Sequence, residues 1–299
     1  MQIMSNTASG FFAMSSLFRL PLAVMVALTA IVGALAGNPA SPRLMMWSLA
    51  WGIFFLSAAC SVLNQVQERT ADALMSRTCH RPVASGLISA HKAGFIGFSL
   101  ASAGLCLLYA GTGPENALAG LFAMGWYLLV YTPMKRVTPW AIVAGTPCGM
   151  LPPLIGWQAA TGEFVSPQAF VLALIMFFWQ VPHFWLLALP DRHELQMAGF
   201  RVLPDALSNQ RLFHISLFWV VGLCSATLLL PIVRLVRLPS LQVVILCLAL
   251  AFVFWSFGCQ RQFVLVEKVA RQLKFGLHLY LGLLLGTLVL HGLATRFGF

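Results

Sequence analysis

The sequence is short of charge, and above all of negative charge. Its 299 residues include only eight aspartates and glutamates, and charged residues of both signs make up 9% of the chain. An ordinary soluble domain has about 25%. Hydrophobic residues make up 60%, with a mean hydropathy of +0.86. A soluble fold of this length has too little interior to hide so much apolar surface. The composition therefore predicts an integral membrane protein.

Other signals are missing as well. None of the seven cysteines belongs to a C-x-x-C pair, and most lie within apolar runs. This pattern indicates small buried hydrophobic residues rather than disulfides or zinc ligands. The N-terminus has neither the charged start and cleavage site of a signal peptide nor the arginines of a transit peptide. We expect residues 1–16 to form a short cytoplasmic tail, within a single membrane-embedded domain over residues 1–299.

Apolar runs follow one another along the chain with short turns between most of them. A helix that crosses a bilayer needs about 20 mostly apolar residues. Nine runs meet this need: 17–37, 44–66, 92–111, 116–134, 140–158, 167–189, 211–231, 240–259 and 275–295. The sequence therefore predicts an all-α, polytopic membrane protein with nine transmembrane helices in the lipid bilayer.

The basic residues predict how the chain is oriented in the membrane. The polar segments 67–91, 190–210 and 260–274 emerge on one side, and 14 of the 18 lysines and arginines fall on that side. Because positive charge marks the cytoplasmic side, we expect the N-terminus in the cytoplasm and the C-terminus outside the cell inner membrane. Part of the net charge of +10 reflects this topology, and no nucleic acid partner is expected.

An unusual polar stretch, SVLNQVQERTADALMSRTCHRP, follows the second apolar run. Within it, Asn64, Glu68 and Asp72 are spaced four residues apart, so they share one face of a helix. Three oxygen ligands on one stripe suit a hard cation. Mg²⁺ in particular prefers carboxylates combined with waters and phosphate oxygens. The spacing therefore indicates a magnesium site at the end of the second span.

Basic residues accompany these acids. Arg77 and Arg81 are also four residues apart, and their forked donors match phosphate oxygens. Lys135 and Arg136 lie in the next loop on the same side of the membrane. We expect all four to reach one anionic group.

A second acidic segment follows the sixth span, where Asp191 and Glu194 are three residues apart. Two carboxylate clusters with basic residues around them suit a Mg²⁺–diphosphate complex, whose charge must be neutralised as diphosphate leaves. The alternative is that these charges are only solvated ion pairs at a helix end. The pairs would then be Glu68–Arg69 and Asp72–Arg77.

His183 lies inside the sixth span, within WQVPHFW, and Pro182 before it would kink the helix. An ionisable residue inside the membrane is a functional candidate, although a hydrogen-bonded core histidine is equally consistent with the pattern. The histidines at or near the ends of spans are given no role. They are His91, His214, His278 and His291.

Five motifs occur in order along the chain: NQVQERTADALMSRTCHRP (64–82), YTPMKRVT (131–138), PPLIGW (152–157), WQVPHFW (179–185) and ELQMAGFRVLP (194–204). In order and spacing they resemble the motifs of the protohaem IX farnesyltransferases, which belong to the UbiA-type intramembrane prenyltransferases. The resemblance runs from roughly residue 17 to residue 295. Four positions depart from the usual pattern: Glu68 and Glu194 replace Asp, Leu195 replaces Tyr, and Ala141 stands where Asn is frequent.

The resemblance implies a nine-helix bundle around a central cavity, with a polar cap on the cytoplasmic side. The implied substrates are farnesyl diphosphate and protohaem IX, with Mg²⁺ as cofactor and haem O as product. The implied partners are a haem A synthase or terminal oxidase assembly. The implied metal ligands are Asn64, Glu68, Asp72 and Glu194, with Asp191 a weaker candidate. The implied diphosphate ligands are Arg77, Arg81, Lys135 and Arg136, and the implied catalytic residues are Glu68, Asp72 and His183. His183 would ligate haem iron or position water.

Two alternative functions stay open at this point. A UbiA-type aromatic prenyltransferase of quinone biosynthesis would use the same diphosphate site, although His183 and its aromatic neighbours favour haem. A haem or lipid transporter, or an assembly factor, would need the acids only as salt bridges. Two metal-suited clusters on one side of the membrane argue against that class.

Overall fold

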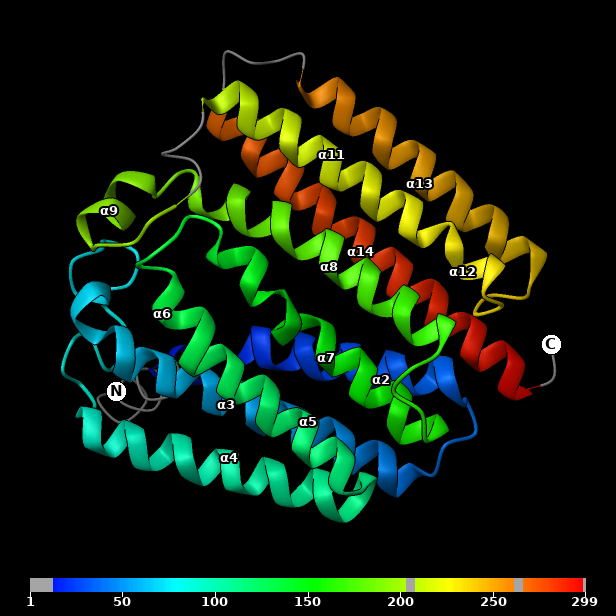
Figure 1. Ribbon diagram of the computed structural model, residues 1–299, viewed down its shortest axis with the longest axis horizontal. Helices are drawn as coiled ribbons and strands as arrows, with labels where there is room; N and C mark the ends of the chain where they lie inside the picture. Colours follow the sequence, from blue (N-terminus) through cyan, green and yellow to red (C-terminus); the bar gives the residue numbers. More distant parts are fainter. Residues whose placement is uncertain (1–12, 203–207, 261–265, 298–299) are drawn as a thin grey trace, which may run out of the picture.

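The computed structural model describes residues 13–202, 208–260 and 266–297, and all regular structure in these ranges is helical (Figure 1). The long helices are α2 (Leu20–Gly37), α3 (Arg43–Asp72), α4 (Ala90–Thr112), α7 (Ala141–Thr161), α8 (Pro167–Ala188), α11 (Asn209–Thr227), α13 (Pro239–Gln260) and α14 (Val266–Phe297). Helix α5 (Pro114–Gly125) continues through a π-helical segment, η1 (Trp126–Tyr131), into α6 (Thr132–Met134). The short α12 (Leu229–Ile232) follows α11, and α9 (Arg192–Met197) follows α8.

Parts of several expected segments lie outside the described residues. They are residues 1–12 of the N-terminal tail, residues 203–204 of the last motif, and residues 261–265 of the polar segment before the last span.

Eight helices of the described chain are long and apolar enough to cross a membrane, so the protein is an all-helical, polytopic membrane protein. The predicted span 140–158 is not among them, so the structure does not confirm the expected count of nine. It forms α7, a helix of 21 residues that contains Pro147, Pro152 and Pro153. Its prolines and polar residues reduce its apolar character, and it packs against α2, α5 and α8.

Two helices extend beyond the membrane spans predicted for them. Helix α3 continues past the expected end at residue 66 to Asp72, and α14 begins at Val266 rather than at residue 275. In both cases the extra turns carry Gln, Glu, Lys or Arg. These residues favour helices as strongly as most apolar residues do. Helix α3 therefore continues after its apolar run, and α14 begins before its own.

The bundle consists of two groups of helices joined through α7. Helices α2, α3, α4 and α5 pack on one side, and α8, α11, α13 and α14 pack on the other (Figure 1). Each group has its own cluster of buried apolar side chains. Helices α2 and α7 approach closely at Gly33 and Gly156, where a Cβ atom would overlap the carbonyl oxygens of Pro153 and Ala30. These two glycines therefore allow α7 to lie in the middle of the bundle.

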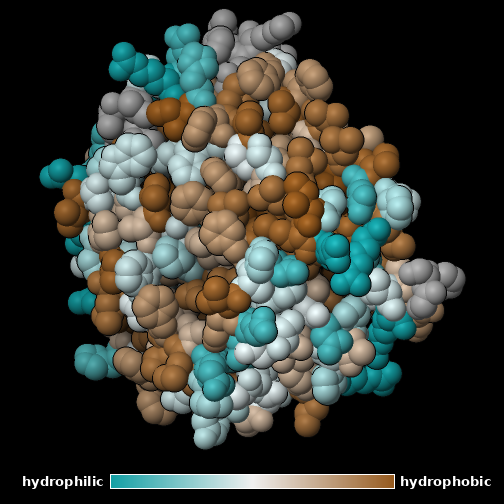
Figure 2. All heavy atoms as spheres, turned by 45° about the vertical axis from the view of Figure 1, so that its right-hand side comes forward, coloured by the Kyte–Doolittle hydropathy of each residue, from teal (hydrophilic) through white to brown (hydrophobic). Residues whose placement is uncertain are grey.

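Large apolar side chains also cover much of the outside. Phe95, Leu129 and Phe254 are 76%, 75% and 73% exposed, on α4, η1 and α13. Figure 2 shows broad apolar patches over one face of the molecule. Apolar surface of this extent is expected where lipid rather than water surrounds a helical protein.

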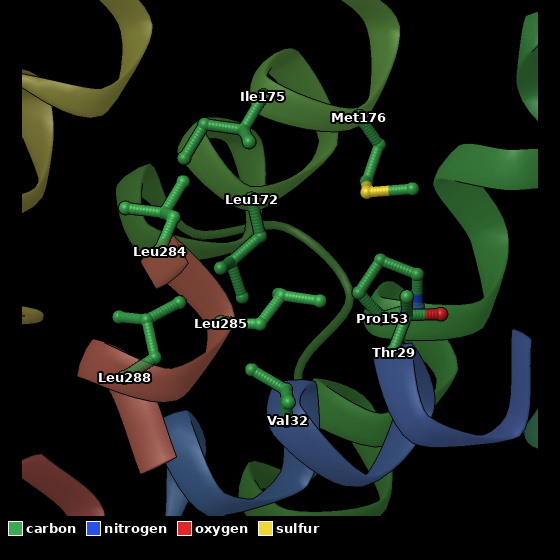
Figure 3. Close-up of a pocket in the computed structure, with 9 residues that line it drawn as sticks. All are labelled: Thr29, Val32, Pro153, Leu172, Ile175, Met176, Leu284, Leu285 and Leu288. Carbon is green, nitrogen blue, oxygen red and sulfur yellow. The ribbon is translucent and has the colours of Figure 1, made fainter. Parts of the chain in front are cut away.

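An apolar crevice lies where α2, α7, α8 and α14 meet (Figure 3). It is lined by Thr29, Val32, Pro153, Leu172, Ile175, Met176, Leu284, Leu285 and Leu288. Its volume is about 10 Å³, which is enough for roughly one water molecule. The crevice therefore marks the junction of the two helix groups, but it is far smaller than the central cavity that the sequence led us to expect.

Candidate active site at the polar ends of α3, α6 and α8

The end of α3 carries the predicted polar stripe, and this stripe faces the protein interior. Asn64, Glu68 and Asp72 are 1%, 6% and 1% exposed, whereas Arg69 between them is exposed. The four-residue spacing places the three side chains on one face of a regular helix. Buried carboxylates need partners because desolvation is costly. Their partners therefore define the site.

Glu68 pairs with Lys135, which follows α6. The distance between Lys135 Nζ and Glu68 Oε1 is 2.5 Å. Lys135 also lies over the rings of Tyr131 and Phe200, at 5.0 and 5.9 Å from their centroids. Burial lowers the pKa of Lys135, and the charge of Glu68 opposes this shift. The ammonium group thus depends on a carboxylate and on aromatic faces for its stability.

Asp72 pairs with Arg81 in the loop after α3. Arg81 Nη1 donates to both carboxylate oxygens of Asp72, at 2.7 and 2.8 Å. Burial lowers the pKa of Arg81, and Asp72 partly offsets this effect. A guanidinium group nevertheless stays protonated in proteins. The alternative pairings of Asp72 with Arg77 and of Glu68 with Arg69 are therefore wrong. Both carboxylates pair with cations that lie farther along the chain, Arg81 and Lys135.

The segment after α8 contacts the loop after α3. Asp191 Oδ2 lies 3.0 Å from Arg77 Nε. Glu194, in α9, accepts hydrogen bonds from the backbone nitrogen and the hydroxyl group of Ser76 at 2.8 and 2.5 Å. These contacts bring the two acidic segments to one end of the bundle, near the α9 label in Figure 1.

Each acid of the expected metal set thus has its own partner. In the described part of the chain, no three side chains of His, Cys, Asp or Glu lie close enough to hold a metal ion together. Asn64 differs from the acids, because its Nδ2 donates to Thr132 Oγ1 at 3.3 Å while its buried Oδ1 has no hydrogen-bond partner. An unpaired amide oxygen beside carboxylates fits the oxygen ligands of Mg²⁺, which keeps waters or phosphates in its remaining positions.

Arg136 lies beside Phe200, with its guanidinium carbon 5.8 Å from the centre of the ring. The backbone nitrogen of Arg201 donates to the carbonyl of Lys135 at 2.9 Å. This bond fastens the segment after α9 to the turn that carries both basic residues. Sequence reasoning missed Phe200, Ser76 and Thr132, because nothing in their local sequence indicates contacts this far along the chain.

The π-helical segment η1 leads directly into the turn with Lys135. Pro133 has no backbone N–H, and its ring would clash with the carbonyl of Leu129, four residues earlier. Thr132 Oγ1 instead donates to the carbonyl of Tyr127, five residues back, at 2.9 Å. The proline in YTPMKR was therefore a usable signal for an irregular helix, and π-helical turns often occur at functional sites.

His183 lies on α8 among aromatic rings. It stacks on Trp179 with 4.8 Å between the ring centroids. The centroid of its ring lies 4.6 Å from that of His278, on α14, and the two ring planes are inclined by 81°. Its Nδ1 is buried without a hydrogen-bond partner, so it is not a hydrogen-bonded core histidine at that atom. Sequence reasoning assigned no role to His278, because its position on a separate apolar helix gives no sign of the pairing.

Residues 25–264 match the UbiA prenyltransferase family. The chain belongs to this family. A protoheme IX farnesyltransferase of Oleidesulfovibrio alaskensis is 40% identical over 79% of this chain and 83% of its own length. A second relative of that name, from Geobacter sulfurreducens, is 40% identical over 72% of this chain and 79% of its own length.

Solved structures of UbiA-type proteins share the fold. A digeranylgeranylglyceryl phosphate synthase superposes with a TM-score of 0.76 at 15% identity, over 94% of this chain and 98% of its own. A UbiA homolog from Archaeoglobus fulgidus, solved with GPP and Mg²⁺, superposes with a TM-score of 0.72 at 17% identity, over the same shares of the two chains. The chain is thus a UbiA-type prenyltransferase in its fold as well as in its sequence.

Proposed function

We propose that this UbiA-family enzyme transfers the farnesyl group of farnesyl diphosphate to a vinyl group of protohaem IX. A carbon–carbon bond forms between farnesyl and the vinyl group, water adds its oxygen to the same group, and diphosphate leaves. The product is haem O. The observation that carries the proposal is the 40% identity, over most of both chains, with a protoheme IX farnesyltransferase.

The charged cluster is suited to bind Mg²⁺ and diphosphate together. We define it as Glu68, Asp72, Asp191 and their partners Lys135, Arg81 and Arg77. The acids and bases of this cluster pair with one another, so neither set is left as uncompensated charge. The acids would hold Mg²⁺, and their basic partners would then be available to phosphate oxygens. Binding of Mg²⁺ alone would leave the basic residues without partners, and binding of diphosphate alone would leave the acids without partners.

The individual roles follow from this exchange. Asn64, Glu68, Asp72 and Glu194 would hold Mg²⁺, with Asp191 as a further ligand, because Asn64 Oδ1 is already unpaired and the carboxylates lie at the same end of the bundle. Bound Mg²⁺ would supply positive charge to the leaving diphosphate. The diphosphate oxygens would be bound by Arg77, Arg81, Lys135 and Arg136. Neutralising the leaving group in this way lowers the barrier to breaking the allylic C–O bond.

His183 would act on the acceptor side of the reaction, at the haem iron or at the water that adds to the vinyl group. Its surroundings support such a role, because Trp179, Phe184 and His278 place aromatic rings around it. Apolar and aromatic walls keep bulk water from the reactive allylic group. The charged cluster also has aromatic faces beside it, because Lys135 lies over the rings of Tyr131 and Phe200.

The remaining features of the proposal concern the setting of the enzyme. The whole chain, residues 1–299, would form one domain with nine membrane helices, including α7, around a central cavity. The site would face the cytoplasm, with the N-terminus on that side of the cell inner membrane and the C-terminus outside. Haem O would pass to a haem A synthase or to terminal oxidase assembly.

Mass analysis of the product tests the proposal. Purified enzyme, Mg²⁺, farnesyl diphosphate and protohaem IX should yield a haem heavier by one farnesyl group and one hydroxyl group, with release of diphosphate and a proton. Omission of farnesyl diphosphate is the matched control. A parallel reaction contains an aromatic acid in place of protohaem. Prenylation of that acid, with no change to haem in the first reaction, would support the quinone-type activity instead. Absence of any prenylated product from folded enzyme that binds haem would favour a carrier.

A further inference from the structure

Helices α8 and α14 share a cluster of three aromatic rings, which we call the aromatic cluster: Trp179, His183 and His278. The indole Nε1 of Trp179 donates to the backbone carbonyl of Leu277 at 2.9 Å. This hydrogen bond crosses between the two helices immediately beside His278. The position of His278 relative to Trp179 and His183 is therefore fixed by backbone as well as by ring packing.

The ring of His278 has the protonation that a metal ligand requires. Its Nδ1 lies 2.7 Å from the carbonyl oxygen of Lys274. A carbonyl oxygen can only accept, so Nδ1 carries the proton. In a neutral imidazole this leaves the lone pair on Nε2. Histidines that bind metals typically donate their other ring N–H to a carbonyl or carboxylate in this way.

The mutual angles of the rings suit a flat ligand. Trp179 and His183 are nearly parallel, at 9°, and the ring of His278 is inclined to them by 90° and 81°. An imidazole that ligates the iron of a porphyrin stands perpendicular to the macrocycle. A porphyrin held at its iron by His278 can therefore lie parallel to the rings of Trp179 and His183 and contact them by stacking.

The cluster continues the apolar crevice along the same helix faces. Trp179 and His183 follow Met176 by three and seven residues on α8, and His278 precedes Leu285 by seven residues on α14. Side chains at these spacings lie on one face of a helix. Figure 3 shows Met176 and Leu285 on the walls of the crevice. Apolar walls therefore lead from the crevice to the histidines.

The aromatic cluster is exposed on the side of His278. His278 is exposed, and Lys274 lies one turn before it, with Arg271 and Lys268 nearer the start of α14. A ligand that contacts His278 can thus extend toward basic side chains. Protohaem has this combination of groups, with an iron atom, a flat apolar ring and two carboxylate side chains at one edge.

We infer that His278 ligates the iron of protohaem through Nε2, with the macrocycle against Trp179 and His183 and its carboxylates toward Lys274. This inference rests on the proposed function and specifies where the acceptor binds. It also assigns iron binding to α14, which leaves His183 beside the macrocycle to position water. The porphyrin lies on the open side of the cluster, because the crevice is too narrow to admit it.

Porphyrin titrations of the full-length protein in lipid nanodiscs test this assignment. Ferric protohaem and metal-free protoporphyrin IX are added separately, and binding is followed by the absorbance of the porphyrin. Wild-type protein should bind the iron form more tightly, by roughly ten- to hundredfold, as for groups that support metal binding. His278→Ala should bind the two porphyrins about equally, and added imidazole should restore the preference for iron.

His291→Ala is the matched control, since His291 lies on the same helix and is 8% exposed. This variant should keep the preference for iron. Equal binding of both porphyrins by wild-type protein would overturn the inference, whether or not His278→Ala folds. So would an unchanged preference in His278→Ala.

The same samples distinguish this inference from the proposed function. Wild-type protein that makes haem O while His278→Ala keeps its iron preference would refute the inference alone. Wild-type protein that binds farnesyl diphosphate and yields no prenylated haem would refute the proposed function.

Discussion

The charged cluster and the aromatic cluster differ in how their polar groups are satisfied. Glu68, Asp72 and Asp191 each pair with a cation at 3.0 Å or less. In the aromatic cluster, by contrast, the buried Nδ1 of His183 has no hydrogen-bond partner among the described residues, and Nδ1 of His278 donates to the carbonyl of Lys274. The first cluster must exchange partners to bind a ligand. The second contains a ring nitrogen, Nδ1 of His183, that pairs with no other described group.

This difference predicts opposite responses to substitution. In the charged cluster, loss of the cation that pairs with Glu68 or Asp72 leaves a buried carboxylate uncompensated, which is strongly destabilising as well as inactivating. In the aromatic cluster, removal of one imidazole leaves no unpaired charge, so the fold should persist while acceptor chemistry is lost. The predictions below use substitutions that separate these two outcomes.

Asp72→Asn should have the largest effect. Asparagine keeps an oxygen that can accept from Arg81, but it removes the negative charge that we assign to Mg²⁺. Loss of such electrostatic stabilisation lowers kcat by roughly 10²–10³. The turnover of purified variant and wild type should be compared at saturating Mg²⁺ and both substrates.

Glu115→Gln is the matched control for Asp72→Asn, because Glu115 is an exposed acid in the first turn of α5. It should keep wild-type turnover. Thermal unfolding of both variants shows whether the loss of activity reflects loss of fold. Folded Asp72→Asn with normal turnover would remove Asp72 from the site.

His183→Gln should have a smaller effect on rate and little effect on donor binding. Glutamine has a similar size, and the charged cluster is unchanged, so farnesyl diphosphate should bind as in wild type. Loss of a group that positions or deprotonates water costs about 10² in rate. The informative measurement is paired: diphosphate binding by the purified variant, and haem O formed per folded molecule.

Two results would change the interpretation of His183. Normal haem O formation would make it an ordinary core residue despite its unpaired nitrogen. Loss of diphosphate binding together with product would show that the two clusters are mechanically coupled.

The sequence predicted the charged face but not its partners. The spacing of Asn64, Glu68 and Asp72 is a local property, and the buried stripe on α3 follows from helix geometry alone. The bonds between Ser76 and Glu194 join residues 118 positions apart. No local pattern encodes a separation of that size, so the exchange of partners could be seen only in the fold.

Helix α7 shows that the packing of the helices, like the partners of the charged residues, could not be predicted from local sequence. Its apolar run resembled a membrane span, and it is a helix over the expected residues. Its place at the centre depends on glycines of two helices, Gly33 and Gly156, which meet only after folding. Periodicity therefore predicted the helices, while their order of packing depended on contacts between distant residues.

Glu68→Asp should have the smallest effect and sharpens the comparison within the charged cluster. Aspartate keeps the charge and withdraws it by about 1.5 Å, the length of one C–C bond. Lys135 has a flexible four-carbon stem that can follow the carboxylate. We therefore expect turnover within about tenfold of wild type, since the anionic metal ligand is retained.

Glu68→Gln is the matched control, because it keeps the length of the side chain and removes its charge. It leaves the buried ammonium group of Lys135 without a counterion, and burial already lowers the pKa of that group. The glutamine variant should therefore lose far more activity than the aspartate variant. Steady-state kinetics of the two variants side by side provide the measurement. Equal losses would show that the position of the carboxylate, rather than its charge, limits the reaction.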